Sequence, residues 1–225
     1  MRVKADVART LVMSAWMPEL APLQRWLRTA AGKRVAGAVD LAVAGVGAVD
    51  AGIGAARAIA ARPPRRVVFV GTAGLYLPRL VDPPPLGHAT TVVATRLLLV
   101  STGVLRGDAY TPAPMVDRLD TSRDLTNALL QASASASPVV AACPLAITLK
   151  SEVGRRIAKS TGARVENLEA FSVGRAAQQA GLPFAAVFGI SNYVFPGAHA
   201  MWRLHHVAAS RAACRLLAAW LKATG

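Results

Sequence analysis

Short apolar runs alternate with alanine-rich segments of helical spacing along almost the whole sequence, and this alternation constrains the fold more than any other feature. Strands are expected at 11–17, 41–45, 67–74, 139–148, 163–166 and 183–190, with a strand pair or hairpin over 89–101. Helices are expected at 19–30, 49–62, 123–133, 151–160, 167–180 and 202–224. Such alternation predicts a layered α/β fold, in which helices cover both faces of a sheet.

The bulk properties of the chain predict one folded domain. Its 225 residues, 53% of them hydrophobic, are enough for one sizeable core, so we expect a single domain over residues 1–225. No apolar run reaches the roughly 18 residues of a membrane span, and we expect no membrane partner. The stretch 11–17 runs into Pro18 without a cleavage pattern, and we interpret it as a strand rather than a signal peptide. Cys143 and Cys214 lack metal-ligand spacing, which is typical of buried thiols in a cytoplasmic protein.

The net charge of +14 raises the question of an anionic partner. Most of the basic residues are arginines, and they are scattered along the chain rather than gathered in one segment. The densest cluster, at 62–66, precedes an apolar run and is interpreted as a solvated loop. We therefore expect no nucleic-acid partner, and an anionic small substrate fits this charge better.

Several familiar motifs are incomplete in this sequence. In GVGAVDAGIG, Asp50 stands where a dinucleotide-binding fingerprint needs its third glycine, so a glycine turn that packs a strand against a helix is the better interpretation. In GISNY, Tyr193 stands where the nucleophile elbow of a serine hydrolase needs glycine. The four histidines show no metal spacing, and His205 and His206 are expected on the surface of a helix. We expect neither a cofactor nor a metal. The irregular stretches 77–87 and 103–114 are candidate surface or lid loops.

Polar residues stand at the ends of several predicted strands. Gly71–Gly74 close one apolar run, and Ser191 with Asn192 follows another. Glutamates are scarce, yet Glu19 follows the first strand and Glu169 opens a late helix. A carboxylate near a helix N-terminus can be purely structural, because it complements the helix dipole. Each feature alone is therefore weak, and their order along the chain carries the information.

In this order the chain resembles the nucleoside phosphorylase/nucleosidase superfamily. The matching segments are AWMPELAPL, VAGVGAVDAGIGAARAI, VVFVGTAGL, ARVENLEAFSV and LPFAAVFGISNYV, with Trp202 downstream. The chain is similar to the methylthioadenosine/adenosylhomocysteine nucleosidases and, in its VENLE and ISNYV segments, more similar to futalosine hydrolases. The resemblance implies a three-layer α/β/α domain with a central mixed sheet, a purine nucleoside as the small-molecule substrate, and a homodimer or higher homo-oligomer.

The resemblance also implies a role for each matching residue. Glu19 matches the glutamate that activates the attacking water, and Glu169 matches the one that binds the ribose hydroxyls. Asn192 and Ser191 match the pair that faces the purine. The remaining implied contacts with water, sugar or base are Trp16, Gly71, Thr72, Ala73, Gly74, Asn167 and Leu168.

Elementary chemistry agrees with these roles. Cleavage of an N-glycosidic bond develops positive charge on the ribose and negative charge on the departing purine. Hydrolysis needs a base that takes a proton from water, which Glu19 could supply. Neutral Asn192 cannot act as an acid on the purine, but its N–H can stabilise the leaving base, and this suits a 6-oxopurine such as hypoxanthine.

The sequence departs from the family pattern at several points. The loop after ISNYV lacks the arginine expected of a futalosine hydrolase, and the middle of the chain, 77–137, matches poorly. Phe188 stands where relatives usually have an arginine that organises the water-activating end of the site. Futalosine hydrolysis, in menaquinone biosynthesis, is the expected function. The alternatives are a methylthioadenosine/adenosylhomocysteine nucleosidase, a purine nucleoside phosphorylase, and a nucleoside-binding protein with weakened catalysis.

Overall fold

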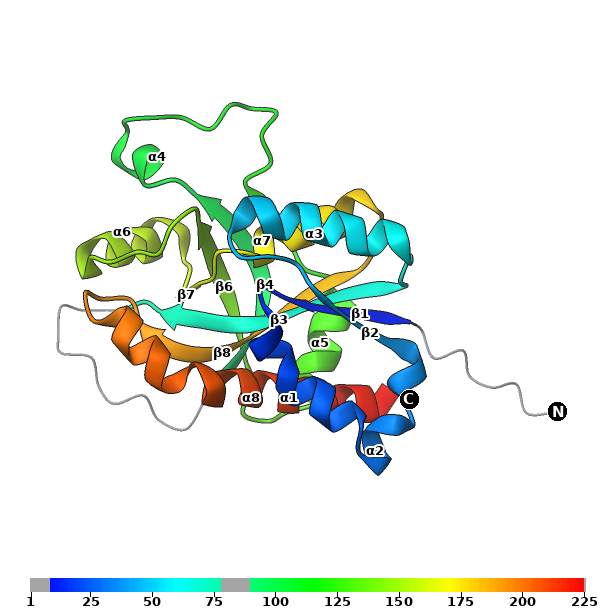
Figure 1. Ribbon diagram of the computed structural model, residues 1–225. Helices are drawn as coiled ribbons and strands as arrows, with labels where there is room; N and C mark the ends of the chain where they lie inside the picture. Colours follow the sequence, from blue (N-terminus) through cyan, green and yellow to red (C-terminus); the bar gives the residue numbers. More distant parts are fainter. Residues whose placement is uncertain (1–8, 78–89, 225) are drawn as a thin grey trace.

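A computed structural model describes residues 9–77 and 90–224 of the chain (Figure 1). The strands are β1 (Thr10–Ser14), β2 (Val39–Val43), β3 (Arg66–Leu75), β4 (Thr91–Val100), β5 (Arg118–Asp120), β6 (Ser137–Pro144), β7 (Val165–Glu166) and β8 (Phe184–Tyr193). The helices are α1 (Met17–Leu27), α2 (Ala30–Lys33), α3 (Ala48–Ala61), α4 (Thr102–Arg106), α5 (Arg123–Gln131), α6 (Ser151–Thr161), α7 (Ala170–Gln179) and α8 (Ala198–Thr224), with a 3-10 turn at Ala36–Ala38. Most of the candidate loop at 77–87 lies outside the described residues.

The central sheet is mixed, as expected. The order β2-β1-β3 is parallel throughout, and β8 pairs in parallel with β3 and antiparallel with β4. β4 also pairs in parallel with β6, and β6 pairs in parallel with the short β7. β7 in turn pairs antiparallel with β3. The pairing therefore closes a ring through β3, β8, β4, β6 and β7, and this ring leaves β8 without a free edge.

Two apolar clusters separate the sheet from its helices. On one face, α3 and α7 pack through small side chains such as Ala51, Ala55 and Ala177. On the other face, α1, α5 and α8 pack through larger ones, with Leu20 and Trp220 fully buried (Figure 1). The α/β architecture with helices on both faces of a sheet is thus confirmed, and the alanine-rich α3 lies close against its neighbours.

Among the expected elements that the structure corrects are the hairpin and the last strand. The stretch expected as a hairpin forms one long strand, β4, because it has a partner on each side in β6 and β8. The strand expected to end at Ile190 continues to Tyr193. Its register with β3 shifts between Ala73 and Gly74, so that Gly74 pairs with Asn192 and Ser191 is the extra residue. Such an irregularity redirects side chains locally, and here it acts at the polar end of the strand.

Gly189 offers a test of the contact between β8 and α8. A Cβ atom placed there would lie 2.0 Å from the backbone oxygen of Ala209, which is fixed within α8. We expect Gly189→Ala to lower the free energy of unfolding by about 1–3 kcal/mol or more, because the helix must move away from the strand. Gly37→Ala is the matched control, since nothing lies within 4 Å of its added methyl group. Urea unfolding of both variants measures the difference, and equal stabilities would contradict this packing.

Candidate active site

A cavity of about 390 Å³ lies where β1, β3 and β8 end. These three strands are parallel, so their carboxyl ends meet at one edge of the sheet. The cavity is lined by ten of the eleven residues predicted for the site, namely Trp16, Glu19, Thr72, Ala73, Gly74, Asn167, Leu168, Glu169, Ser191 and Asn192. The fold thus brings together residues that are up to 176 positions apart in the sequence.

Gly71 is the predicted residue that does not line the cavity. It lies behind the wall, where an added Cβ would meet the Phe69 ring at 3.0 Å and Glu19 Oε2 at 3.5 Å. Gly71 is thus separated from the cavity in this structure, and its contact with a substrate stays a prediction. The glycine instead leaves room for the carboxyl group of Glu19 beside the aromatic core.

The carboxyl group of Glu19 is held from one side only. Pro18 stands at the start of α1, and Glu19 lies in the first turn of that helix with only 5% of its surface exposed. Its Oε1 accepts hydrogen bonds from the Thr72 backbone N–H at 2.9 Å and the Thr72 hydroxyl at 3.0 Å. Its Oε2 is buried and has no hydrogen-bond partner among the described residues. An unpaired buried oxygen is a costly feature that is typical of functional sites, because a ligand or a water can satisfy it.

Burial raises the pKa of Glu19 from its ordinary value of 4.5 to about 8. The two hydrogen bonds from Thr72 oppose this effect, and the nearby carboxyl group of Glu169 adds to it. The titration of Glu19 is thus placed near neutral pH, where a general base works best.

Glu169 is fixed by the turn before α3 and by its own helix start. Its Oε1 accepts a hydrogen bond from the backbone N–H of Gly47 at 3.0 Å, and Gly47 has a positive φ of 82°. Asn167 accepts hydrogen bonds from the backbone N–H groups of Glu169 and Ala170, and donates to Thr72 O at 3.1 Å. Asn167 therefore ties the start of α7 to β3, and burial raises the pKa of Glu169.

The amide of Asn192 has a defined orientation. The Ser191 hydroxyl donates to Asn192 Oδ1 at 2.8 Å, and Asn192 Nδ2 donates to the Tyr193 backbone oxygen at 3.0 Å. An amide nitrogen carries two hydrogens, so one N–H of Asn192 is left for a ligand in the cavity. Gly74 makes this position possible, since an added Cβ would lie 3.0 Å from Nδ2.

An aromatic wall at the start of α8 was not predicted as a whole. We define it as Trp16, His199, Trp202 and His206. The Trp202 ring stacks on His206 with centroids 4.5 Å apart and on His199 at 5.7 Å, and Trp16 lies 6.0 Å from Trp202. His206 was expected on the surface, but it is half-buried against the two indoles. The sequence signal that could have predicted these contacts is the spacing of the three α8 residues, each about one helical turn from the next: His199, Trp202 and His206.

Glu166 is a third acidic residue of the cavity, beside Glu19 and Glu169, and sequence reasoning passed over it. The Tyr76 hydroxyl donates to its Oε2 at 3.0 Å, and the Thr148 backbone N–H donates to its Oε1 at 3.1 Å. Burial raises the pKa of Glu166. Both oxygens are thus engaged by the protein, which indicates a structural clamp between β3, β7 and the 145–150 segment.

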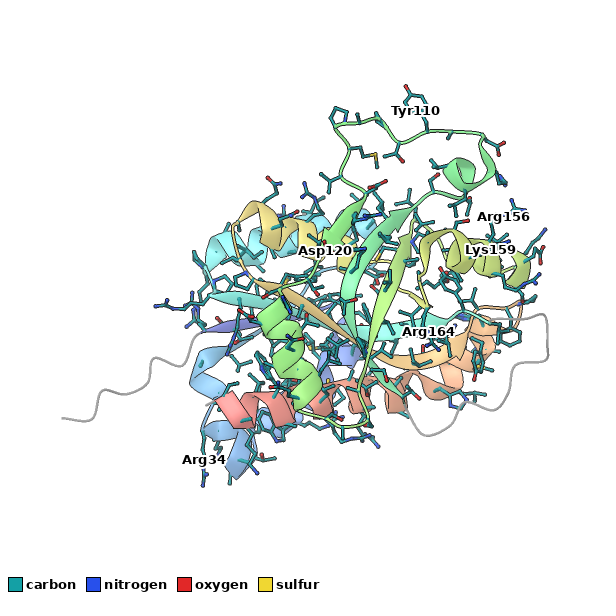
Figure 2. All side chains as sticks on the ribbon, turned by 180° about the vertical axis from the view of Figure 1, so that it is seen from behind. Arg34, Tyr110, Asp120, Arg156, Lys159 and Arg164 are labelled. Carbon is teal, nitrogen blue, oxygen red and sulfur yellow. The ribbon has the colours of Figure 1, made fainter. Side chains whose placement is uncertain are left out.

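The lysines and arginines that the structure describes lie outside the lining of the cavity. None of the described lining residues is a lysine or an arginine, and Phe188 is fully buried against Phe69 with ring centroids 6.2 Å apart. Arg156 and Lys159 of α6 instead project outward (Figure 2). Across 9–77 and 90–224, no group of three His, Cys, Asp or Glu residues is placed to hold a metal, and no helix is long and apolar enough to cross a membrane.

A family model described as the phosphorylase superfamily matches residues 21–223. The chain belongs to the phosphorylase superfamily. No curated protein sequence matches the chain at a significant level.

Solved structures of other superfamily proteins share the fold at low identity. The 5'-methylthioadenosine/S-adenosylhomocysteine nucleosidase of Neisseria meningitidis, in complex with methylthio-immucillin-A, has a TM-score of 0.80 and 18% identity over 96% of this chain and 99% of its own. A futalosine hydrolase mutant of Helicobacter pylori has a TM-score of 0.80 and 16% identity over 95% and 98%. The S-adenosylhomocysteine nucleosidase of Streptococcus pyogenes, in complex with 5-methylthiotubericidin, has a TM-score of 0.79 and 17% identity over 98% and 99%. At these identities the likeness establishes the fold and leaves the substrate open.

The raised pKa of Glu19 makes a prediction about stability. Between pH 4.5 and about 8, the folded protein keeps a proton on Glu19 that the unfolded chain releases, so folding becomes less favourable as the pH rises. We expect Glu19→Gln to gain stability relative to wild type over this range, by up to about 1.4 kcal/mol per pH unit, with a constant difference above it. Urea unfolding at a series of pH values measures this slope. Glu152→Gln, at an exposed position of α6, is the control for the loss of an acidic side chain. A pH-independent difference for Glu19→Gln would contradict the raised pKa.

Proposed function

We propose that this protein hydrolyses the N-glycosidic bond of a purine nucleoside. The observation that carries the proposal is the buried, unpartnered Oε2 of Glu19 in the same cavity as a free N–H of Asn192. A proton acceptor for water and a neutral donor for the leaving base are the two groups that such a hydrolysis needs. Membership of the phosphorylase superfamily supports this assignment.

Each group in the cavity takes one part of the reaction. Glu19 removes a proton from a water that attacks the anomeric carbon. Glu169, held by Gly47, accepts hydrogen bonds from the ribose hydroxyls and fixes the sugar. Asn192 donates its free N–H to the purine as negative charge develops on it, and Ser191 keeps the amide oriented. Thr72 supplies two hydrogen bonds to Glu19 and thereby favours its ionised form.

We propose futalosine as the substrate, with hypoxanthine and dehypoxanthine futalosine as products. The VENLE and ISNYV segments and the neutral Asn192 support a 6-oxopurine over adenine. The similarity to a solved futalosine hydrolase is compatible with this choice, but the nucleosidases for methylthioadenosine and adenosylhomocysteine are equally similar in fold. A nucleosidase of that second kind is therefore the main alternative.

Two observations weigh against phosphorolysis. None of the described lining residues carries a cationic side chain that could bind phosphate. Glu19, when ionised, would also repel a phosphate at the position of the attacking water. Hydrolysis avoids both problems, because water is neutral.

Phe188 supports a second candidate function, a nucleoside-binding protein with weakened catalysis. Its ring is fully buried in the apolar core, so it cannot supply the charge that an arginine would bring to Glu19. The cavity, Glu169 and Asn192 would still bind a nucleoside. The two candidates differ in turnover alone and share the same ligand.

We also propose a homo-oligomer, in the simplest case a dimer, in the cytoplasm. Val46, Val49 and Ile53 are exposed beside the cavity, with 65%, 73% and 50% of their surface accessible, and a second copy could cover them. The free buried thiols of Cys143 and Cys214 support a reducing compartment.

The proposal is tested by measuring base release from futalosine, aminofutalosine, methylthioadenosine, adenosylhomocysteine and inosine, with and without phosphate. We expect release of hypoxanthine from futalosine without phosphate. We expect Glu19→Gln to reduce kcat by about 10²–10⁴-fold while the nucleoside still binds, because the variant lacks the base. Release that requires phosphate would establish a phosphorylase. Thermal stabilisation by a nucleoside without any release would establish the binding protein.

Asn192→Asp tests the group that faces the purine. The new carboxyl group would lie beside the Tyr193 backbone oxygen, and this contact favours its protonated form. A protonated carboxyl can donate a proton to N7 of adenine, so we expect the ratio of kcat/KM for adenine over hypoxanthine nucleosides to rise by about tenfold or more, equivalent to about 1.4 kcal/mol. Ser191→Ala is the control, since it loosens the amide without adding an acid. An unchanged ratio in Asn192→Asp would leave Asn192 as a strand-end residue with no role in base recognition.

A further inference from the structure

We propose that Trp202 is a positioning residue that acts on Glu19 through the hydroxyl group of Thr72. Trp202 Nε1 lies 3.3 Å from Thr72 Oγ1, and Thr72 Oγ1 lies 3.0 Å from Glu19 Oε1. The three side chains come from α8, β3 and α1, so the chain of hydrogen bonds joins three separate elements at one wall of the cavity. The proposal uses the proposed function only in taking Glu19 as the base.

The direction of each hydrogen bond follows from the chemistry of the three groups. An indole N–H is a donor only, so the Thr72 hydroxyl oxygen must accept from Trp202. The single hydrogen of that hydroxyl is then directed to Glu19 Oε1, which also accepts from the Thr72 backbone N–H at 2.9 Å. With two donors on Oε1, a proton on Glu19 has its place on Oε2. The relay thus selects Oε2 as the atom that takes a proton from water.

The indole of Trp202 is held in position from both sides. His199 precedes it by three residues and His206 follows it by four, so all three lie on one face of α8. Their rings stack on the indole with centroid distances of 5.7 and 4.5 Å and interplanar angles of 18°. Stacking fixes the plane of the ring, and with it the direction of the Nε1–H bond toward Thr72.

The relay opposes the effect of burial on Glu19. Hydrogen bonds donated to a carboxylate favour its ionised form and lower its pKa. Without the indole N–H, the Thr72 hydroxyl is free to rotate away from Oε1, and the pKa of Glu19 rises further. Among residues 9–77 and 90–224, the other titratable groups that face this region are Glu169 at the start of α7, Cys214 of α8, whose thiol donates to the Glu19 backbone oxygen at 3.2 Å, and the two stacked imidazoles. Conservative changes at Trp202 and Thr72 leave all of them in place.

Trp202→Phe removes the donor and keeps an aromatic ring for stacking. We expect the ionisation midpoint of Glu19 to rise by about half a pH unit to one unit, the size expected for one hydrogen bond to a carboxylate. The midpoint is measured in the pH profile of kcat and, without any need for turnover, in the ¹³C NMR shift of the Glu19 carboxyl carbon. Trp26→Phe on α1, away from the cavity lining, is the matched control and should leave the midpoint unchanged.

A double-mutant cycle tests the route through Thr72. In a Thr72→Val background the hydroxyl is absent, so Trp202→Phe should cause no additional shift of the midpoint. In a Thr72→Ser background the hydroxyl is retained, and the shift should return. The same shift in the Val background would overturn the relay, because Trp202 would then act by packing or desolvation.

A measurement on the wild-type protein keeps the test independent of whether Trp202→Phe folds. The ¹⁵N–¹H resonance of the Trp202 indole should titrate with the midpoint of Glu19, and this step should disappear in Glu19→Gln. An indole resonance that shows no Glu19-dependent step overturns the proposal. If the step is present but no nucleoside is cleaved, the relay stands and the proposed function fails.

Discussion

The buried carboxyl group of Glu19 is the constraint on which the rest of the cavity depends. Burial raises its pKa to about 8, and the fold offsets this cost only in part, mainly through the two hydrogen bonds from Thr72. Those bonds require β3 to end beside the first turn of α1, which the parallel pairing of β1 and β3 provides. They also leave Oε2 without a partner among the described residues. The arrangement that stabilises the buried carboxyl group therefore keeps one of its oxygens available to a ligand or a water.

Phe188 places an apolar ring, rather than a charge, at its position in the sheet. Phe188 occupies β8 at full burial and packs on Phe69, so this position contributes to the stability of the sheet rather than to the electrostatics of the cavity. A cation would have lowered the pKa of Glu19 by direct attraction. In its place, hydrogen bonds from Thr72 and the aromatic wall of α8 surround the acid.

The parts of the fold that sequence predicted well were those with a strong local signal. One example is the glycine turn at 45–47 followed by α3. Gly54 lets that helix lie against the end of β2, since a Cβ atom at Gly54 would lie only 1.9 Å from the Ala44 backbone oxygen. The end of β8 is the opposite case. Ser191 and Asn192 look like residues beyond a strand, but pairing with Gly74 and Leu75 of β3 extends the ladder past them. Such pairing depends on a partner strand more than a hundred residues away, so the local hydrophobic pattern does not predict it.

By itself, the sequence determined the alternation of strands and helices, the family, and the identity of ten residues that come to line one cavity. The alternation follows from hydrophobic spacing, which is a local property, whereas the family and the ten residues follow from the resemblance of several short segments to the superfamily. Only the tertiary structure decided which oxygen of Glu19 is free, that Gly71 lies behind the wall, and that His199, Trp202 and His206 stack beside Thr72. The physical reason is that hydrogen-bond direction, burial and ring stacking depend on atoms from separate elements. They are set when β3, α1 and α8 pack together, and no stretch of the sequence contains them alone.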